Sequence, residues 1–298
     1  MKLENKYGAP QSFMDFCSRD SYSRGDSDFS ATDLIEEPRI VALKRMYPDM
    51  GTEDPYENPW KYVSTIFHSL MEYHSPVGET AEQRLFSEIE GVRISGAMDV
   101  EIADGGKVTI GDYKMTTVYS TKDTKKWEQQ LNIYAWLVEK ETGQTVSGLA
   151  VYAFIRDWKI SMSEKIRGYP PRPGMTIAIP LWGFEERQEF IESRVRLHKE
   201  CSKIEDEASL PACSEGARWP SGTLYSLDYI TDDGGARKKL FKTKKLANNF
   251  LESLSFEDQL VSFIDKTNET FRRCKSYCEF SDVCSVWAEW KNEREKEL

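Results

Sequence analysis

The stretch Ser95-Gly96-Ala97-Met98-Asp99, followed further along by Gly111-Asp112-Tyr113-Lys114, predicts a β-hairpin that carries two carboxylates and a lysine. Residues 92–102 and 107–115 are strand-like, and Asp104-Gly105-Gly106 between them is typical of a turn. With Gly105 and Gly106 as a two-residue loop, Asp99 lies directly opposite Asp112. Lys114 then shares a face with Asp112.

This pair of carboxylates needs a compensating group, since like charges facing each other destabilise a sheet by about 0.2–1 kcal/mol. Val108 and Ile110 share the face of Asp112, and charges on such an apolar face are usually paired or bound to metal. A hard divalent cation fits between the carboxylates, and the lysine could steady a phosphate or polarise a water. The set suits metal-assisted phosphodiester hydrolysis; a solvated surface hairpin is the alternative.

Two helices could complete such a site. Asn58 and Pro59 are typical of a helix start, and the helix that follows has an apolar stripe expected to face the core: Trp60, Val63, Phe67, Leu70 and Met71. His68 beside this stripe is either a metal ligand or a hydrogen-bonded core histidine.

The second predicted helix spans residues 127–141. Gln130 and Tyr134 lie four residues apart, so they share a face with Leu131 and Val138. They either point towards the metal site or DNA, or belong to a helix that simply packs on the sheet.

The order His68, Asp99, Asp112-Tyr113-Lys114, Gln130, Tyr134 resembles the PD-(D/E)xK nuclease superfamily, in its RecB-like and phage exonuclease branch. Segments 29–39, 127–135, 210–213 and 273–278 carry a wider similarity to phage-encoded members, over roughly residues 29–287. The resemblance implies an α/β fold with a restriction-endonuclease-like core, in which helices flank a mixed central sheet, and a cysteine-stapled C-terminal lobe.

The resemblance also implies the roles of the site residues. One or two Mg²⁺ or Mn²⁺ ions would be held by His68, Asp99, Asp112 and the Tyr113 carbonyl. Lys114 would assist the attacking water, and Gln130 and Tyr134 would support the site. The family often has glycine where this chain has Ser64. A further acidic residue is expected among Glu72, Glu82 and Glu88, with Glu82 preferred.

The cysteines form a second signal. Cys274, Cys278 and Cys284 are clustered, which in a reducing compartment suggests a metal site rather than disulfides. Their spacing differs from that of a standard zinc finger, which leaves zinc as the second choice. The resemblance implies a 4Fe-4S cluster with a distant fourth ligand.

The preferred fourth ligand is Cys213, and Cys17 is the runner-up; Cys201 is expected to be a free thiol. The alternative is three unrelated buried cysteines. The cluster would have a structural role, tying the C-terminal tail to the segment around Cys213.

Composition and pattern suggest three parts. Residues 1–28 are polar and read as a flexible arm, residues 29–205 as the nuclease core, and residues 206–298 as the cysteine lobe. Hydrophobic content of 39% supports a sizeable core. Within the core, residues 149–158 and 176–181 are strand-like, and residues 185–200 form an amphipathic helix.

The net charge of −10 counts mildly against a nucleic-acid partner. The charge is uneven, however, because residues 237–245 form a basic run, and Lys122, Lys125 and Lys126 precede the Gln130 helix. These groups either contact phosphates or are simply solvated.

The function implied is a metal-dependent DNA nuclease, with exonuclease favoured over endonuclease, acting in recombination, replication or DNA degradation. A non-catalytic module that binds DNA or a partner is the main alternative, and a zinc-stapled structural protein is a third. DNA is the expected partner, and a homo-oligomer or a phage recombination or replication partner is compatible with the resemblance. No signal peptide or membrane span is recognisable, so a cytoplasmic location is expected, that of the host if the chain is phage-encoded.

Overall fold

The computed structural model describes residues 2–18, 25–48, 50, 52–74, 79–222, 224–230, 235–267 and 270–296. The chain divides into two compact units, Met1–Leu210 and Pro211–Leu298.

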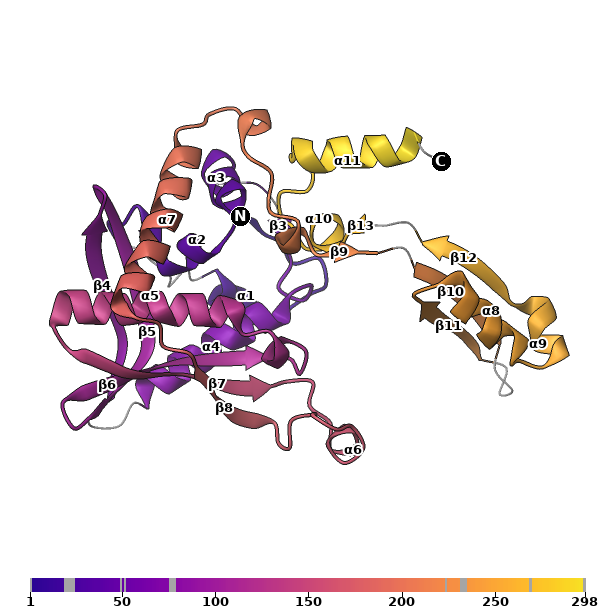
Figure 1. The fold of residues 1–298 in the computed structure, drawn as a ribbon, viewed down its shortest axis with the longest axis horizontal. Coiled ribbons are helices and arrows are strands. Elements are labelled where there is room, and N and C mark those ends of the chain that lie inside the picture. Colours follow the sequence, from indigo (N-terminus) through magenta and orange to yellow (C-terminus); the bar gives the residue numbers. More distant parts are fainter. Residues whose placement is uncertain are drawn as a thin grey trace. The chain divides into compact units, whose positions relative to one another are not determined.

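A mixed sheet forms the centre of the first unit (Figure 1). Strands β4 (Glu79–Ile89), β5 (Val92–Asp104) and β6 (Lys107–Thr116) form an antiparallel meander. Strand β7 (Thr145–Ile155) runs parallel to β6, and β8 (Gly174–Ile179) runs antiparallel to β7. The short strand β2 (Phe29–Ser30) lies parallel to β5. The expected α/β architecture with a mixed sheet is therefore confirmed.

Helix α5 (Lys125–Thr142) makes the crossover from β6 to β7 and ends at Gly143, which has a φ of 70°. All side chains of residues 131–138 are buried, because α5 packs on the sheet and is covered by other helices. Gly96 of β5 allows α5 to approach the sheet closely, because a Cβ at this position would lie 2.7 Å from atoms of Leu137 and Tyr134. A side chain at this position would therefore push α5 away from β5.

Helices α2 (Ala31–Ile35) and α7 (Phe184–Ser202) share the layer of α5, and α3 (Pro38–Met46) packs against α7. Ser30 begins α2 with a capping box, in which Ser30 and Asp33 satisfy each other's backbone N–H groups. Arg194 of α7 donates to the carbonyl oxygens of Leu34 and Glu36 at the other end of α2. The short helix is thus held at both ends.

His198 of α7 is 1% exposed and packs against the ring of Phe29. Burial and the charge of Arg194 lower its pKa to about 4, from an ordinary value of 6.5. At pH values between 4 and 6.5, His198 is therefore protonated in the unfolded chain and neutral in the folded chain. Stability is unaffected above pH 6.5 and falls as the pH drops towards 4.

We expect the free energy of unfolding to fall by about 2 kcal/mol from His198 alone between pH 7.5 and pH 5. His198→Gln should flatten this dependence, measured by urea unfolding at both pH values. The control is His74→Gln, because His74 is exposed at the end of a helix. A His198→Gln chain with the pH dependence of the parent would contradict the assignment.

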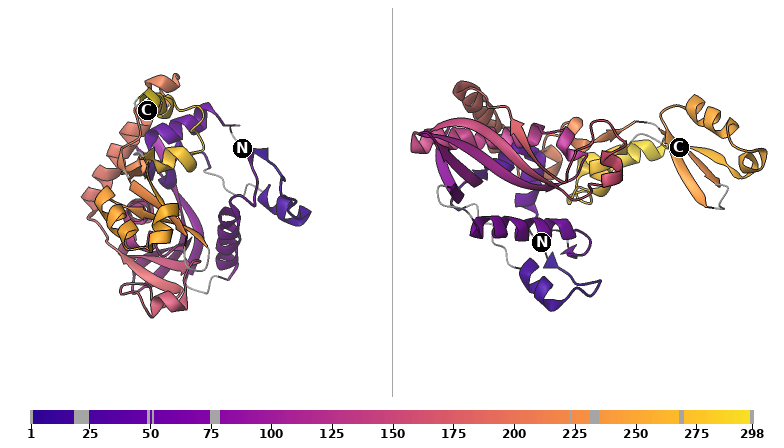
Figure 2. Two further views of the ribbon diagram at one scale, coloured as in Figure 1. Left: turned by 90° about the vertical axis from the view of Figure 1, so that its right-hand side faces the viewer. Right: turned by 90° about the horizontal axis from the view of Figure 1, so that it is seen from below.

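Helix α4 (Pro59–Tyr73) lies on the opposite side of the sheet from α7 (Figure 2, right-hand view). It begins where expected, with Pro59 in the first turn, although Asn58 makes no side-chain cap. The expectation of a core stripe was wrong, because Trp60 is 45% and Leu70 is 50% exposed. Only part of this apolar face is covered.

The first 28 residues were expected to form a flexible arm. Their described part contains strand β1 (Lys2–Leu3), which pairs with β3 (Thr52–Glu53), and helix α1 (Gln11–Cys17). Asp54 connects residues on both sides of this strand pair, because its carboxylate accepts hydrogen bonds from the backbone N–H groups of Lys6 and Tyr56. This regular structure was not predicted from the sequence.

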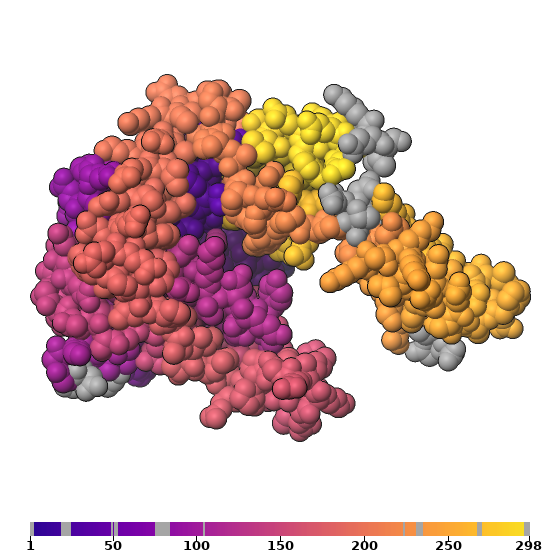
Figure 3. Space-filling model, viewed as in Figure 1, coloured from indigo at the N-terminus to yellow at the C-terminus, as the bar shows by residue number. Residues whose placement is uncertain are grey.

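In the second unit, residues 224–230 and 235–267 form a lobe of their own (Figure 3). Its sheet has the order β11-β10-β12, from β10 (Leu224–Ile230), β11 (Ala236–Phe241) and β12 (Phe263–Thr267). Helices α8 (Lys244–Glu252) and α9 (Phe256–Val261) pack on β10. The basic run of residues 237–245 therefore lies on an edge strand and at the start of α8.

The rest of this unit contains the cysteine segment. Strands β9 (Pro220–Ser221) and β13 (Thr270–Phe271) pair before α10 (Arg272–Ser276) and α11 (Ser285–Lys296). Among the helices that the structure describes in either unit, none is both long and apolar enough to span a membrane.

Candidate active site

The β5–β6 hairpin has the predicted register. Pairs run from Asp104 with Lys107 to Val100 with Gly111, so the next pair in this register is Asp99 with Asp112. The regular ladder ends before that pair, and a side chain takes over: Asp99 Oδ2 accepts the backbone N–H of Tyr113 at 2.8 Å. The carboxylate is therefore fixed where the two strands separate.

Asp112 and Lys114 form an ion pair at the same place. Lys114 Nζ lies 2.9 Å from Oδ1 and 2.7 Å from Oδ2 of Asp112. The Asp112 side chain is 4% exposed and that of Lys114 is 25% exposed. The expected proximity of the two groups is thus seen in the structure.

Burial raises the pKa of Asp112; the charge of Lys114 opposes this shift and that of Asp99 adds to it. For Lys114, burial alone would lower the pKa, but the charge and hydrogen bond of Asp112 outweigh burial and raise it. The lysine therefore stays protonated, and its charge helps to keep the buried carboxylate ionised.

His68 reaches this site from α4. Its Nδ1 lies 3.2 Å from Asp99 Oδ1, so Asp99 contacts both the helix and the neighbouring strand. Burial would lower the pKa of His68, but the hydrogen bond and charge of Asp99 outweigh it and raise the pKa. His68 is thus a histidine hydrogen-bonded to Asp99 with a side chain that is 30% exposed, and its role as a metal ligand stays a prediction.

Gln130 and Tyr134 form a pair on α5, with Gln130 Nε2 donating to the Tyr134 hydroxyl at 2.7 Å. Tyr134 is 4% exposed and rests against Gly96, three residues before Asp99 on β5. The pair therefore lies over the strand that carries the first carboxylate.

The expected additional acid, Glu82, lies on β4. The neighbouring pairs, Ala81 with Val100 and Gln83 with Met98, put the Glu82 backbone opposite Asp99; its side chain lies outside the described residues. Glu88 pairs with Arg93 near the far end of β4. Glu82 remains a prediction.

Two carboxylates, a nearby backbone carbonyl and an imidazole are donors that suit Mg²⁺ or Mn²⁺. Asp112 Oδ2 also fits such a role, since it is buried and accepts no hydrogen bond of good geometry, although Lys114 lies beside it. Within the described residues, no three histidine, cysteine, aspartate or glutamate side chains are already gathered as a metal-binding group. The donor atoms are of the kinds that bind Mg²⁺ or Mn²⁺, but the described side chains are not arranged around a common point as a complete set of ligands.

The thiols of Cys274, Cys278 and Cys284 lie close enough to interact. Burial raises the pKa of Cys274, and the neighbouring Cys278 and Cys284 raise it further. Cys213 belongs to the same unit, whereas Cys17 lies in α1 of the first unit. Cys201 is a buried free thiol of α7. These cysteines likewise do not form a ready metal-binding group in the described part of the chain.

The model of the PD-(D/E)XK nuclease superfamily matches residues 37–285. This chain belongs to that superfamily. Its members are generally metal-dependent nucleases that typically use Mg²⁺ or Mn²⁺, and the family implies a DNA substrate. No curated protein matches the sequence.

Two solved structures are similar to this superfamily member. The crystal structure of SSO0001 has a TM-score of 0.40 and 17% identity, covering 63% of this chain and 83% of its own. A protein of Eubacterium rectale to which exonuclease activity has been ascribed has a TM-score of 0.32 and 15% identity. That match covers 55% of this chain and 62% of the other.

Aromatic side chains that were not predicted from the sequence lie beside the site. Tyr152 packs against Tyr113 at a centroid distance of 5.5 Å, and Phe154 packs against Phe67 at 4.6 Å. The alternation Tyr152-x-Phe154 within a predicted strand was the available signal, since it puts both rings on one face.

Proposed function

We propose that this chain is a metal-dependent exonuclease that hydrolyses DNA, of the phage-encoded type within its superfamily. The observation that carries the proposal is the group formed by Asp99, Asp112 and Lys114 where β5 and β6 separate. A buried ion pair beside a second carboxylate has little value as a stabilising device. It suits a site that binds a cation and a phosphate.

The proposed roles follow from the contacts. Asp99, Asp112, His68 and the Tyr113 carbonyl would hold the ion, which when bound would lower the pKa of a water and offset phosphate charge. Lys114, held by Asp112 at 2.7 Å, would orient the attacking water and donate to a phosphate oxygen. Gln130 and Tyr134 would keep α5 in place over the site.

The basic run of residues 237–245 supports DNA as the substrate. Lys238 pairs with Asp228 at 3.4 Å, and Lys239 lies 3.7 Å from the centre of the Phe250 ring. The side chains of Lys242, Lys244 and Lys245 are exposed. We propose that these side chains contact DNA phosphates, which would make binding depend on salt concentration.

The test is cleavage of end-labelled linear DNA and closed circular DNA by the full chain, with Mg²⁺, Mn²⁺ or EDTA. Metal-dependent loss of linear DNA alone is expected, and the position of the label that is lost first gives the polarity. Cutting of the circle would replace exonuclease by endonuclease. Metal-independent binding with no cleavage of either DNA would instead assign the chain as a non-catalytic binding module.

We also propose that Cys274, Cys278 and Cys284 bind a 4Fe-4S cluster, with Cys213 as the fourth ligand. The spacing of the three cysteines and the mutual effect of their thiols support the proposal. Purification without oxygen should yield iron and sulfide in equal amounts, and Cys274→Ser should lose both and lower the melting temperature. Stoichiometric zinc, or a melting temperature unchanged in Cys274→Ser, would contradict an iron–sulfur staple. Cys201→Ser is the matched control.

A further inference from the structure

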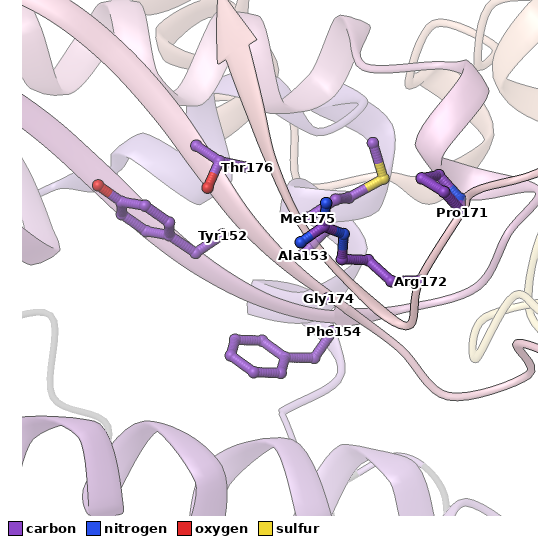
Figure 4. Close-up of a pocket in the computed structure, with 8 residues that line it drawn as sticks. All are labelled: Tyr152, Ala153, Phe154, Pro171, Arg172, Gly174, Met175 and Thr176. Atoms are coloured by element: carbon purple, nitrogen blue, oxygen red, sulfur yellow. The ribbon is translucent and has the colours of Figure 1, made fainter.

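A pocket of about 430 Å³ in the first unit is lined by residues of the paired strands β7 and β8 and of the loop before β8 (Figure 4). Tyr152 and Phe154 of β7 line it, together with Gly174 of β8 and Arg172 of the preceding loop. Phe154 pairs with Gly174 in the sheet register. Because Gly174 has no side chain, the position beside the Phe154 ring stays open.

The two rings of the pocket connect it to the candidate active site. Tyr152 packs on Tyr113, which lies between Asp112 and Lys114. Phe154 packs on Phe67, the residue before His68. One ring therefore contacts a residue assigned to the site, and the other contacts the residue next to His68.

The same surface exposes large aromatic groups. Phe154 is 41% and Trp60 is 45% exposed, and the guanidinium of Arg156 lies 4.7 Å from the centre of the Trp60 ring. Trp60 and Phe67 are seven residues apart on α4 and so lie on one side of the helix. The apolar face of α4 that the core leaves uncovered thus belongs to this aromatic surface.

The segment that connects β7 to β8 is also positively charged. Residues 156–172 contain five basic and two acidic side chains, in a chain of net charge −10. Arg156 and Arg172 are exposed, and neither forms an ion pair with another described residue. Exposed arginines beside exposed rings suit phosphates alternating with bases.

We propose that this pocket binds an unpaired DNA base, stacked on Phe154, with Arg172 and Arg156 contacting the flanking phosphates. The inference rests on the proposed function and deepens it, because it makes the substrate single-stranded at the point where it enters the site. Bases within a duplex stack on each other and do not offer their faces to a side chain. An unpaired base does, whatever its identity.

The test measures binding without cleavage. The full chain in EDTA is titrated against a fluorescent oligothymidine of about 15 nucleotides and against a duplex of equal length. Phe154→Ala should weaken binding of the single strand about 5- to 100-fold and leave duplex binding unchanged. Tyr73→Ala, which removes an exposed ring from the other end of α4, should change neither.

A second test fills the pocket with Gly174→Phe, and Gly174→Ala is its matched control. A Cβ at Gly174 would meet no atom within 4 Å, so Gly174→Ala should fold as the parent does. Gly174→Phe would extend its ring from the same point into the space beside Phe154. Gly174→Phe should weaken binding of the single strand as Phe154→Ala does, and Gly174→Ala should not. Circular dichroism checks the fold of each variant.

Unchanged affinity for the single strand in both Phe154→Ala and Gly174→Phe would overturn the proposal, as would equal losses for single strand and duplex. Absence of single-strand binding by the parent would also overturn it. Because the assay contains no metal, these outcomes are separate from the cleavage test. If the parent cuts DNA and neither variant changes the affinity for the single strand, the proposed nuclease function stands and only the proposed base-binding pocket fails.

Discussion

Lys114→Met is expected to reduce DNA cleavage by about 10³-fold or more and to leave the fold intact. Lys114 is the cation within 3 Å of Asp112, whose side chain is 4% exposed. Without it, burial and the charge of Asp99 would raise the pKa of Asp112 further. The variant would thus lose the group that contacts phosphate and also favour a protonated carboxyl, which is a poor metal ligand.

The measurement is single-turnover cleavage of end-labelled linear DNA in Mg²⁺, with circular dichroism to verify folding. Lys107→Met is the control on the same strand, because Lys107 is exposed beside the hairpin turn. Lys114→Arg should recover little activity, since the planar guanidinium cannot replace a compact ammonium group in this geometry. Cleavage by Lys114→Met within tenfold of the parent would exclude the assigned role.

Arg39→Met is expected to destabilise the first unit by about 3–5 kcal/mol. Arg39 of α3 is 1% exposed, donates to the Leu210 carbonyl oxygen at 2.7 Å, and pairs with Glu207. The substitution keeps most of the side-chain volume but leaves the acceptors of Leu210 and Glu207 without this partner. Residues 207–210 would then be held less firmly against α3.

Urea unfolding measures the loss of stability, and limited proteolysis should show new cleavage near residues 207–210. Arg196→Met is the matched control: Arg196 pairs with Glu90 on the surface and is 57% exposed, so its loss should cost less than about 1 kcal/mol. Adding Glu207→Leu to Arg39→Met should recover part of the stability, because it removes the carboxylate that has lost the charge of Arg39. If Arg39→Met loses no more stability than the control, Arg39 does not have the proposed role of holding residues 207–210 against α3.

The β5–β6 hairpin and α5 could be predicted because both depend on local signals. A two-residue turn sets the register of its own strands, which is why the pairing from Asp104 to Val100 agrees with the structure. The bond between Gln130 and Tyr134 follows in the same way from a spacing of four residues on a helix.

Other features depend on partners that are distant in the sequence. Apolar periodicity on α4 showed which residues share a face but not what covers that face, so Trp60 was wrongly assigned to the core. Nothing near Arg39 in the sequence indicates a partner at Glu207, and nothing near Lys2 indicates a strand partner at Thr52. The family resemblance predicted that His68 lies near Asp99. The spacing of residues in the sequence did not by itself decide the role of His68.

The end of the β5–β6 ladder also provides a spectroscopic probe. Since a carboxylate oxygen of Asp99 accepts the Tyr113 amide hydrogen at 2.8 Å, that amide resonance should lie downfield and exchange slowly with solvent. Any ion or nucleotide that draws the carboxylate away should move the resonance and speed up its exchange. Occupancy of the site could then be followed by nuclear magnetic resonance at a backbone atom, without a reporter group attached to the protein.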